Sequence, residues 1–173
     1  KISKGFSELK PSAYTSSALA PVLDFRQPPT DKSNMAKYLF GGFERCLYPV
    51  QKFQSDPERR LSVILEREAL KWFKPAKGQF QIYYKSGADH PEYQPDFVAE
   101  TDSCILMLEP KAKNQMDAPD VLAKKDAAVL WCKQASDYAM TYQGKQWKYL
   151  LVPHDSIVEN MTLDFLSAQF QAA

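Results

Sequence analysis

A Pro-Asp pair and a later Glu-x-Lys triplet are the residues of this chain best suited to chemistry. Asp96 follows Pro95 ahead of an apolar stretch, and Glu109 and Lys111 follow the apolar run of residues 104–108. Alternate side chains of a strand share a face, so Glu109 and Lys111 are expected to point the same way. If the two strands pair through a turn near residues 101–103, Asp96 comes close to both. Two carboxylates beside an amine form a site for a hard cation, which is the equipment for hydrolysing a phosphodiester bond.

The elements that must position these residues alternate between helices and strands. Ser55 or Asp56 can cap a helix that has Pro57 at its first position. The apolar stripe of this helix consists of Leu61, Ile64, Leu65, Ala69 and Trp72. Alternation predicts strands over residues 77–84, 93–100 and 103–109, then a helix from Pro119 to about Tyr138, a strand over 145–152 and a helix over 162–170. The order of the core is αβββαβ, which predicts an α/β fold with a central mixed sheet flanked by helices.

The first part of the chain has a different character. Residues 1–34 contain four prolines and many Ser and Thr residues, which predicts an arm or linker from a preceding domain, with a short strand near residues 22–25. Met35, Leu39, Phe43 and Leu47 recur at helical spacing and predict a helix over 35–47. The chain starts at Lys1 rather than Met, which is typical of a fragment of a longer protein.

The motif resembles that of the PD-(D/E)xK nuclease superfamily, in which a Pro-Asp and a later Glu-x-Lys lie on adjacent strands. Residues 53–59, 124–132 and 147–154 are similar to segments of the carboxy-terminal endonuclease domain of type III restriction enzymes. The likeness runs from about Tyr38 to Leu166, and the αβββαβ order is also the core order of the superfamily. It implies a restriction-endonuclease-like nuclease domain over residues 35–173. Pro110 departs from the family pattern, which has an apolar residue such as valine there, and puts full catalytic competence in doubt.

The resemblance implies a Mg²⁺-dependent endonuclease that cuts double-stranded DNA. Asp96 and Glu109 would hold the metal, and Lys111 would orient or deprotonate the attacking water. Glu58 resembles a glutamate that the superfamily often has on its first helix, facing the metal site. The implied partners are a helicase-like, ATP-driven translocase domain of the same parent chain and a methyltransferase (modification) subunit.

Other polar residues are candidates for contacts with nucleic acid. Lys113, Lys125 and Gln134 lie on or near the second long helix, which in this superfamily packs beside the site. Gln134 and Tyr138 also match the Gln-x-x-x-Tyr motif of a related branch. Each candidate has a structural alternative: Asp96 can cap a strand, Glu58 can favour a helix dipole, and the lysines can be solvated charges.

Composition and motifs narrow the function classes. The net charge of +1 gives no general nucleic-acid signature, and no apolar run is long enough to span a membrane. Cys46, Cys104 and Cys132 have no CxxC spacing, which predicts free thiols in a reducing, cytoplasmic setting. His90 and His154 lack partners at metal-ligand spacing, and no phosphate-gripping GxxxxGK[ST] loop exists. A catalytically impaired nuclease fold kept for DNA binding or docking, and a DNA-repair nuclease, remain as alternatives.

Overall fold

A four-stranded mixed sheet forms the centre of the molecule. The structure is a computed structural model, and it describes residues 21–172 of the chain. The strand order is β4 (Lys71–Phe73), β7 (Phe97–Glu100), β8 (Cys104–Lys111), β9 (Gln146–Pro153). The pairs β4–β7 and β7–β8 are antiparallel, whereas β8–β9 is parallel. The fold is therefore mixed α/β, as the sequence predicts at this level.

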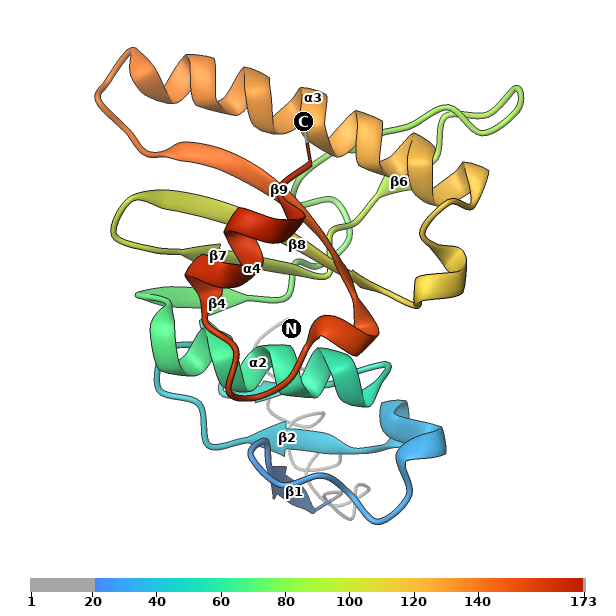
Figure 1. The fold of residues 1–173 in the computed structure, drawn as a ribbon, viewed down its shortest axis with the longest axis vertical. Coiled ribbons are helices and arrows are strands. Elements are labelled where there is room, and N and C mark those ends of the chain that lie inside the picture. Colours follow the sequence, from blue (N-terminus) through green and yellow to red (C-terminus); the bar gives the residue numbers. More distant parts are fainter. Residues whose placement is uncertain (1–20, 173) are drawn as a thin grey trace, which may run out of the picture.

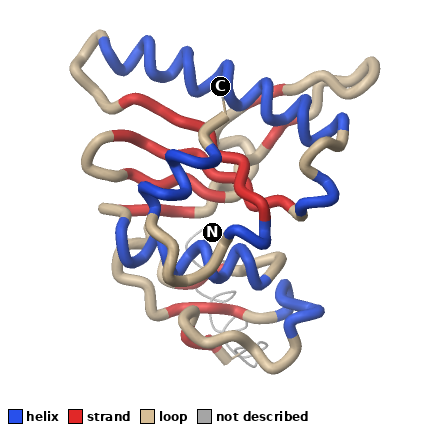
Figure 2. Tube along the Cα trace, in the orientation of Figure 1, coloured by secondary structure: helices blue, strands red, loops and turns tan. Residues whose placement is uncertain are grey.

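Helices cover both faces of this sheet (Figures 1 and 2). On one face, α2 (Asp56–Glu68) and α4 (Leu163–Phe170) enclose a core that includes Leu106, Leu108 and Leu150. On the other face, α3 (Pro119–Met140) packs along β9 over a second core that includes Met107 and Tyr149. None of the helices within residues 21–172 combines the length and hydropathy needed to cross a bilayer.

A second, smaller sheet lies beneath α2 in the view of Figure 1. It consists of β1 (Val22–Asp24), β2 (Leu39–Gly41) and β3 (Val50–Gln51), with the 3-10 helix η1 (Lys32–Lys37) between β1 and β2. The strand expected near residues 22–25 is confirmed. Residues 1–20, which are most of the expected arm, lie outside the described part of the chain.

The helix expected over residues 35–47 is wrong, because the chain forms β2 there. Gly41 lets β1 approach closely: a Cβ at this position would lie 2.7 Å from the Val22 side chain. Gly42 has φ of +91°, in the left-handed region that glycine tolerates, so the helix cannot continue. The helical spacing of Met35 and Leu39 is a coincidence of two short elements that share one core.

The apolar stripe expected for α2 extends beyond the end of the helix. The helix ends at Glu68, and Trp72 belongs to β4, where its Nε1 donates to Glu66 Oε2 at 2.7 Å. Within the strand expected over residues 77–84, only β5 (Ile82–Tyr83) forms. It pairs with β6 (Glu92–Tyr93) outside the main sheet, because Gly78 and Gln81 have positive φ angles that break the strand. β4 therefore takes the position in the αβββαβ order that residues 77–84 were expected to fill.

The two motif strands are also revised. The strand expected over residues 93–100 is divided into β6 and β7, and residues 94–96 lie between them. β8 extends past Glu109 to Lys111. The expected α3, β9 and α4 are confirmed within two residues at each end.

Two buried charged side chains join the parts of the fold. The Glu66 carboxylate accepts hydrogen bonds from the backbone of Glu44 and Arg45 as well as from Trp72, so the segment after β2 is fastened to α2 and β4. Arg59 is 2% exposed and donates to Asp56 Oδ1 at 2.7 Å, to the Phe25 carbonyl at 2.9 Å and to Glu159 Oε1 at 3.0 Å. A single guanidinium thus contacts the small sheet, α2 and the segment before α4.

Candidate active site

Asp96 and Glu109 lie at the same end of the main sheet. The antiparallel ladder between β7 and β8 has Phe97 opposite Leu108 as its last pair. Asp96 and Glu109 are the next residue on either strand beyond that pair, so they leave the ladder side by side. Asp96 precedes β7 because Pro95 interrupts the strand pairing there.

Glu109 is held rigidly by two partners. Its Oε1 lies 3.0 Å from Lys111 Nζ, and its Oε2 accepts a hydrogen bond from Tyr93 Oη at 2.9 Å. Only 6% of the residue is exposed. Burial, and then the Glu109 carboxylate, raise the pKa of Tyr93 well above its usual range, so the phenol remains a donor. The expected convergence of Glu109 and Lys111 on one face is present.

Pro110 does not end the strand. β8 pairs with β9 through Lys111, with Pro110 opposite Val152, whereas β7 pairs with β8 only as far as Leu108. Beyond Leu108 one side of β8 has no ladder partner within residues 21–172, and a proline without an N–H group fits such a half-free strand end. The concern that proline displaces Lys111 is not supported, because Lys111 reaches Glu109 across it.

Asp96 is the most perturbed acid of the site. Burial, and then the Glu109 charge, raise the pKa of Asp96 to about 8, and Glu58 adds to this rise while Lys74 and Lys111 oppose it. An acid with a raised pKa beside a second carboxylate is typical of a functional site, because ordinary surface carboxylates keep a low pKa.

Glu58 enters the site from the first turn of α2. Its carboxylate accepts from Gln54 N at 3.1 Å and lies 2.6 Å from Lys74 Nζ, and Ser55 Oγ accepts from its backbone N–H at 3.4 Å. The helix-capping role that the sequence left open is therefore present, and Glu58 also acts electrostatically on Asp96. Lys74, which the sequence analysis missed, lies 4.4 Å from the centre of the Phe97 ring. Its only sequence signal is a lysine directly after an apolar pair.

His154 and Arg60 add to the charged surroundings of Glu58 and Lys111. Because β8 and β9 are parallel and Lys111 is opposite Pro153, His154 follows at the same strand ends. Burial lowers the pKa of His154. Glu58 opposes this shift, whereas the positive charges of Lys111 and Arg60 add to it. Arg60 Nε is buried without a hydrogen bond in residues 21–172, and it lies 3.5 Å from Asp56 Oδ2. His154, which has no metal-ligand spacing in the sequence, is thus a neighbour of the site.

The candidate nucleic-acid contacts are divided between the two ends of α3. Lys113 is exposed beside the strand ends, 3.6 Å from Asp155 Oδ2, and Lys125 lies on the first half of α3, 3.7 Å from Asp126 Oδ1. Gln134 lies at the opposite end, in a surface hollow with Trp147. Trp147 is four residues before Leu151, the partner of Glu109 on β9, or about 13 Å along a strand. Gln134 and Tyr138 are therefore not brought to the carboxylates.

The residues present fit one divalent cation held by a carboxylate pair. Among residues 21–172, no three His, Cys, Asp or Glu side chains form a group able to hold a metal by themselves. Mg²⁺ does not require such a cage, since it takes one or two protein carboxylates and keeps waters or substrate oxygens for its other positions. The raised pKa of Asp96 beside Glu109 is the observation that fits a bound cation.

Comparison of the chain with models of known protein families, and with curated proteins, gives no match.

Proposed function

We propose that this chain is a metal-dependent endonuclease domain that hydrolyses phosphodiester bonds of double-stranded DNA. The observation that carries the proposal is the meeting of Asp96, Glu109 and Lys111 at one end of the sheet, with the Asp96 pKa raised by burial and by Glu109. The motif resemblance to the PD-(D/E)xK superfamily supports the same chemistry. A restriction-endonuclease-like core is part of this proposal.

Each residue of the site has a role in this reaction. Asp96 and Glu109 would hold Mg²⁺, which supplies Lewis-acid stabilisation of the phosphate when bound. The Lys111 ammonium, 3.0 Å from Glu109 Oε1, would stabilise the developing phosphate charge and orient the attacking water. Tyr93 fixes the Glu109 carboxylate through its hydroxyl, and Lys74 fixes Glu58. Positioning of this kind supplies a large part of the rate enhancement in phosphodiester hydrolysis.

His154, Arg60 and Lys113 are suited to contact the DNA backbone next to the cut. His154 and Lys113 follow the ends of β9 and β8, and Arg60 lies on α2. Arg60 and Lys113 carry positive charge, and the His154 ring can donate a hydrogen bond. Contacts between cationic side chains and phosphates position a duplex without reading its sequence. As the cutting module of a type III-like restriction enzyme, the domain would receive DNA from a helicase-like translocase in the same parent protein, and a methyltransferase subunit would read the site.

The test is cleavage of supercoiled plasmid by the 173-residue protein in Mg²⁺ and in Mn²⁺, over a range of protein concentrations. Asp96→Asn keeps the size of the side chain and removes the ligand charge, so cutting should fall at least about a hundredfold. Asp102→Asn is the matched control, because Asp102 is exposed in the turn at the far end of the two motif strands. Equal cutting by the two variants would disprove the assignment of the site.

One observation favours a second candidate, a nuclease fold kept for DNA binding without catalysis. Both oxygens of Glu109 already have a partner, Tyr93 and Lys111, so the carboxylate is neutralised without a metal. Under this alternative, DNA binding is independent of divalent ions. Fluorescence anisotropy of a labelled duplex in EDTA and in Ca²⁺ separates the two, because a metal-dependent nuclease should bind its substrate more tightly with Ca²⁺.

A further inference from the structure

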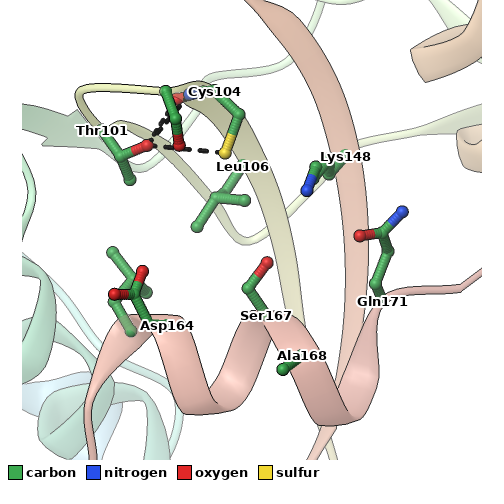
Figure 3. Close-up of a pocket in the computed structure, with 10 residues that line it drawn as sticks. Thr101, Cys104, Leu106, Lys148, Asp164, Ser167, Ala168 and Gln171 are labelled. Atoms are coloured by element: carbon green, nitrogen blue, oxygen red, sulfur yellow. Dashed lines mark hydrogen bonds between the residues drawn. The ribbon is translucent and has the colours of Figure 1, made fainter.

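A polar cavity lies on the face of the sheet opposite to the side chains of Glu109 and Lys111. Its volume is about 250 Å³, and it is bounded by the β7–β8 turn, the first half of β8, β9 and α4 (Figure 3). Cys104, which lines it, is five residues before Glu109 on β8, or about 16 Å along the strand. The cavity is therefore separate from the candidate active site.

Lys148 lies where its row of side chains on β9 changes from buried apolar residues to the exposed Gln146. Along β9, Leu150 and Val152 point toward α2 and α4 and are buried, and Lys148 is the next residue of that row. It is opposite Leu106 and lines the cavity beside it. The residue is half-buried, and its ammonium forms no ion pair or hydrogen bond within residues 21–172. A lysine that lines a cavity without a protein partner is free to bind an anion there.

The opposite wall carries groups that complement an anion with hydroxyls. Ser167 lies on α4, and Gln171 directly follows this helix. Figure 3 shows the Ser167 hydroxyl and the Lys148 amine directed into the same space. Asp164 lies one helical turn before Ser167 and lines the same cavity, yet it forms no ion pair with Lys148. Thr101 is not available, because its hydroxyl is already bonded to Cys104. The cavity therefore has a cationic end, an anionic end and a gap between them.

We propose that this cavity binds a small phosphate ester that carries hydroxyl groups, such as a sugar phosphate or a nucleoside monophosphate. Lys148 holds the phosphate as a compact charge with several donors, and Ser167 and Gln171 donate to its other oxygens. Asp164 accepts a hydroxyl of the sugar, and Leu106 and Leu163 pack against its carbon atoms. The volume equals about eight water molecules, which suits a ligand of this size.

The experiment is a titration of the 173-residue protein, followed by amide chemical shifts, with inorganic phosphate, ribose 5-phosphate and AMP. Lys148→Gln should weaken binding of both esters about tenfold, since it removes a charged hydrogen-bond donor. Lys133→Gln is the matched control, because Lys133 is an exposed lysine on α3 at the other face of the sheet. Lys148→Met, which keeps the length of the side chain without its charge, is a second variant that should also lose binding.

Asp164→Asn gives the sharper result, because its effect should change sign with the probe. Loss of the hydroxyl acceptor should weaken ribose 5-phosphate about threefold, whereas loss of the nearby negative charge should leave inorganic phosphate bound equally or more tightly. Tighter binding of AMP than of ribose 5-phosphate would identify the ligand as a nucleotide, and equal binding of the two would identify it as a sugar phosphate. Absence of saturable binding of both esters overturns the proposal, and so does equal binding by Lys148→Gln and Lys133→Gln.

Discussion

Glu109 and Lys111 form an ion pair of 3.0 Å across Pro110, inside a strand that continues through all three residues. The two side chains share a face because the strand alternates, and the proline between them points to the other face. The motif therefore keeps its geometry despite the departure at its central residue. Proline has no backbone N–H, and this donor is not needed on the side where β7 has already ended.

Pro110→Val should consequently be close to neutral. Valine suits a strand, and the parallel pairing with Val152 already fixes the backbone. We expect plasmid cleavage to change less than about threefold and stability by less than about 1 kcal/mol, measured by urea unfolding. A large fall in cleavage with unchanged unfolding would mean that proline itself sets the geometry of Lys111.

Asp96→Asn should raise stability at alkaline pH when metal is absent. The pKa of the carboxyl is about 8 in the folded protein, against an ordinary value of 3.8. The folded state therefore binds the proton more tightly, and the stability that this proton supplies is complete below pH 3.8 and is lost as the pH rises through 8. The asparagine variant has no such loss. Its melting temperature in EDTA should exceed that of the natural protein at pH 8.5 and match it near pH 4. At pH 8.5 the free energies of unfolding should differ by about 2 kcal/mol after allowance for solvent screening.

Mg²⁺ should reverse this difference. A cation held by Asp96 and Glu109 binds only the folded state, so millimolar Mg²⁺ should raise the melting temperature of the natural protein by a few degrees, or about 1–2 kcal/mol. Asp96→Asn should show no such rise, and the exposed-turn variant Asp102→Asn should respond like the natural protein. Removal of the metal with EDTA should restore the first melting temperature. An equal response in all three proteins would place the ion elsewhere.

Lys74→Met should be strongly destabilising. The substitution leaves Glu58, whose side chain is only 7% exposed, without its 2.6 Å partner, at a cost of about 3 kcal/mol. Lys71→Met is a matched control, since Lys71 is 73% exposed and its partner Glu100 keeps a second lysine, Lys145. That control should cost less than about 0.5 kcal/mol in urea unfolding. Similar losses in the two variants would show that Lys74 does not stabilise Glu58.

Arg60→Gln should weaken DNA binding in Ca²⁺ and lower its dependence on salt. Loss of one phosphate contact should reduce the slope of log affinity against log salt by about one. Arg26→Gln removes the same charge from an exposed position on the small sheet and should leave the slope unchanged. The measurement is fluorescence anisotropy of a labelled duplex at several salt concentrations. Identical slopes for the two variants would exclude Arg60 from the interface.

The sequence was sufficient for the parts of this site that follow from local rules. Alternation along β8 predicted that Glu109 and Lys111 share a face, and the capping signal at Ser55 predicted the start of α2. In the small sheet only β1 was expected, because β2 and β3 are two or three residues long, too short for a periodic pattern. Lys74, Tyr93 and His154 were missed for another reason. Their positions depend on strand register and on loop paths, and only the folded chain brings them to Glu58, Glu109 and Lys111.

The buried Glu66 and Arg59 have a consequence for how the molecule melts. Each side chain bonds to groups from separate parts of the fold, so detachment of the small sheet would break hydrogen bonds of two buried charged groups. Such a penalty couples the local opening of residues 22–51 to the opening of the central sheet. Hydrogen exchange at the backbone of β2 should therefore be as slow as exchange in β8, and residues 22–172 should unfold as one cooperative unit.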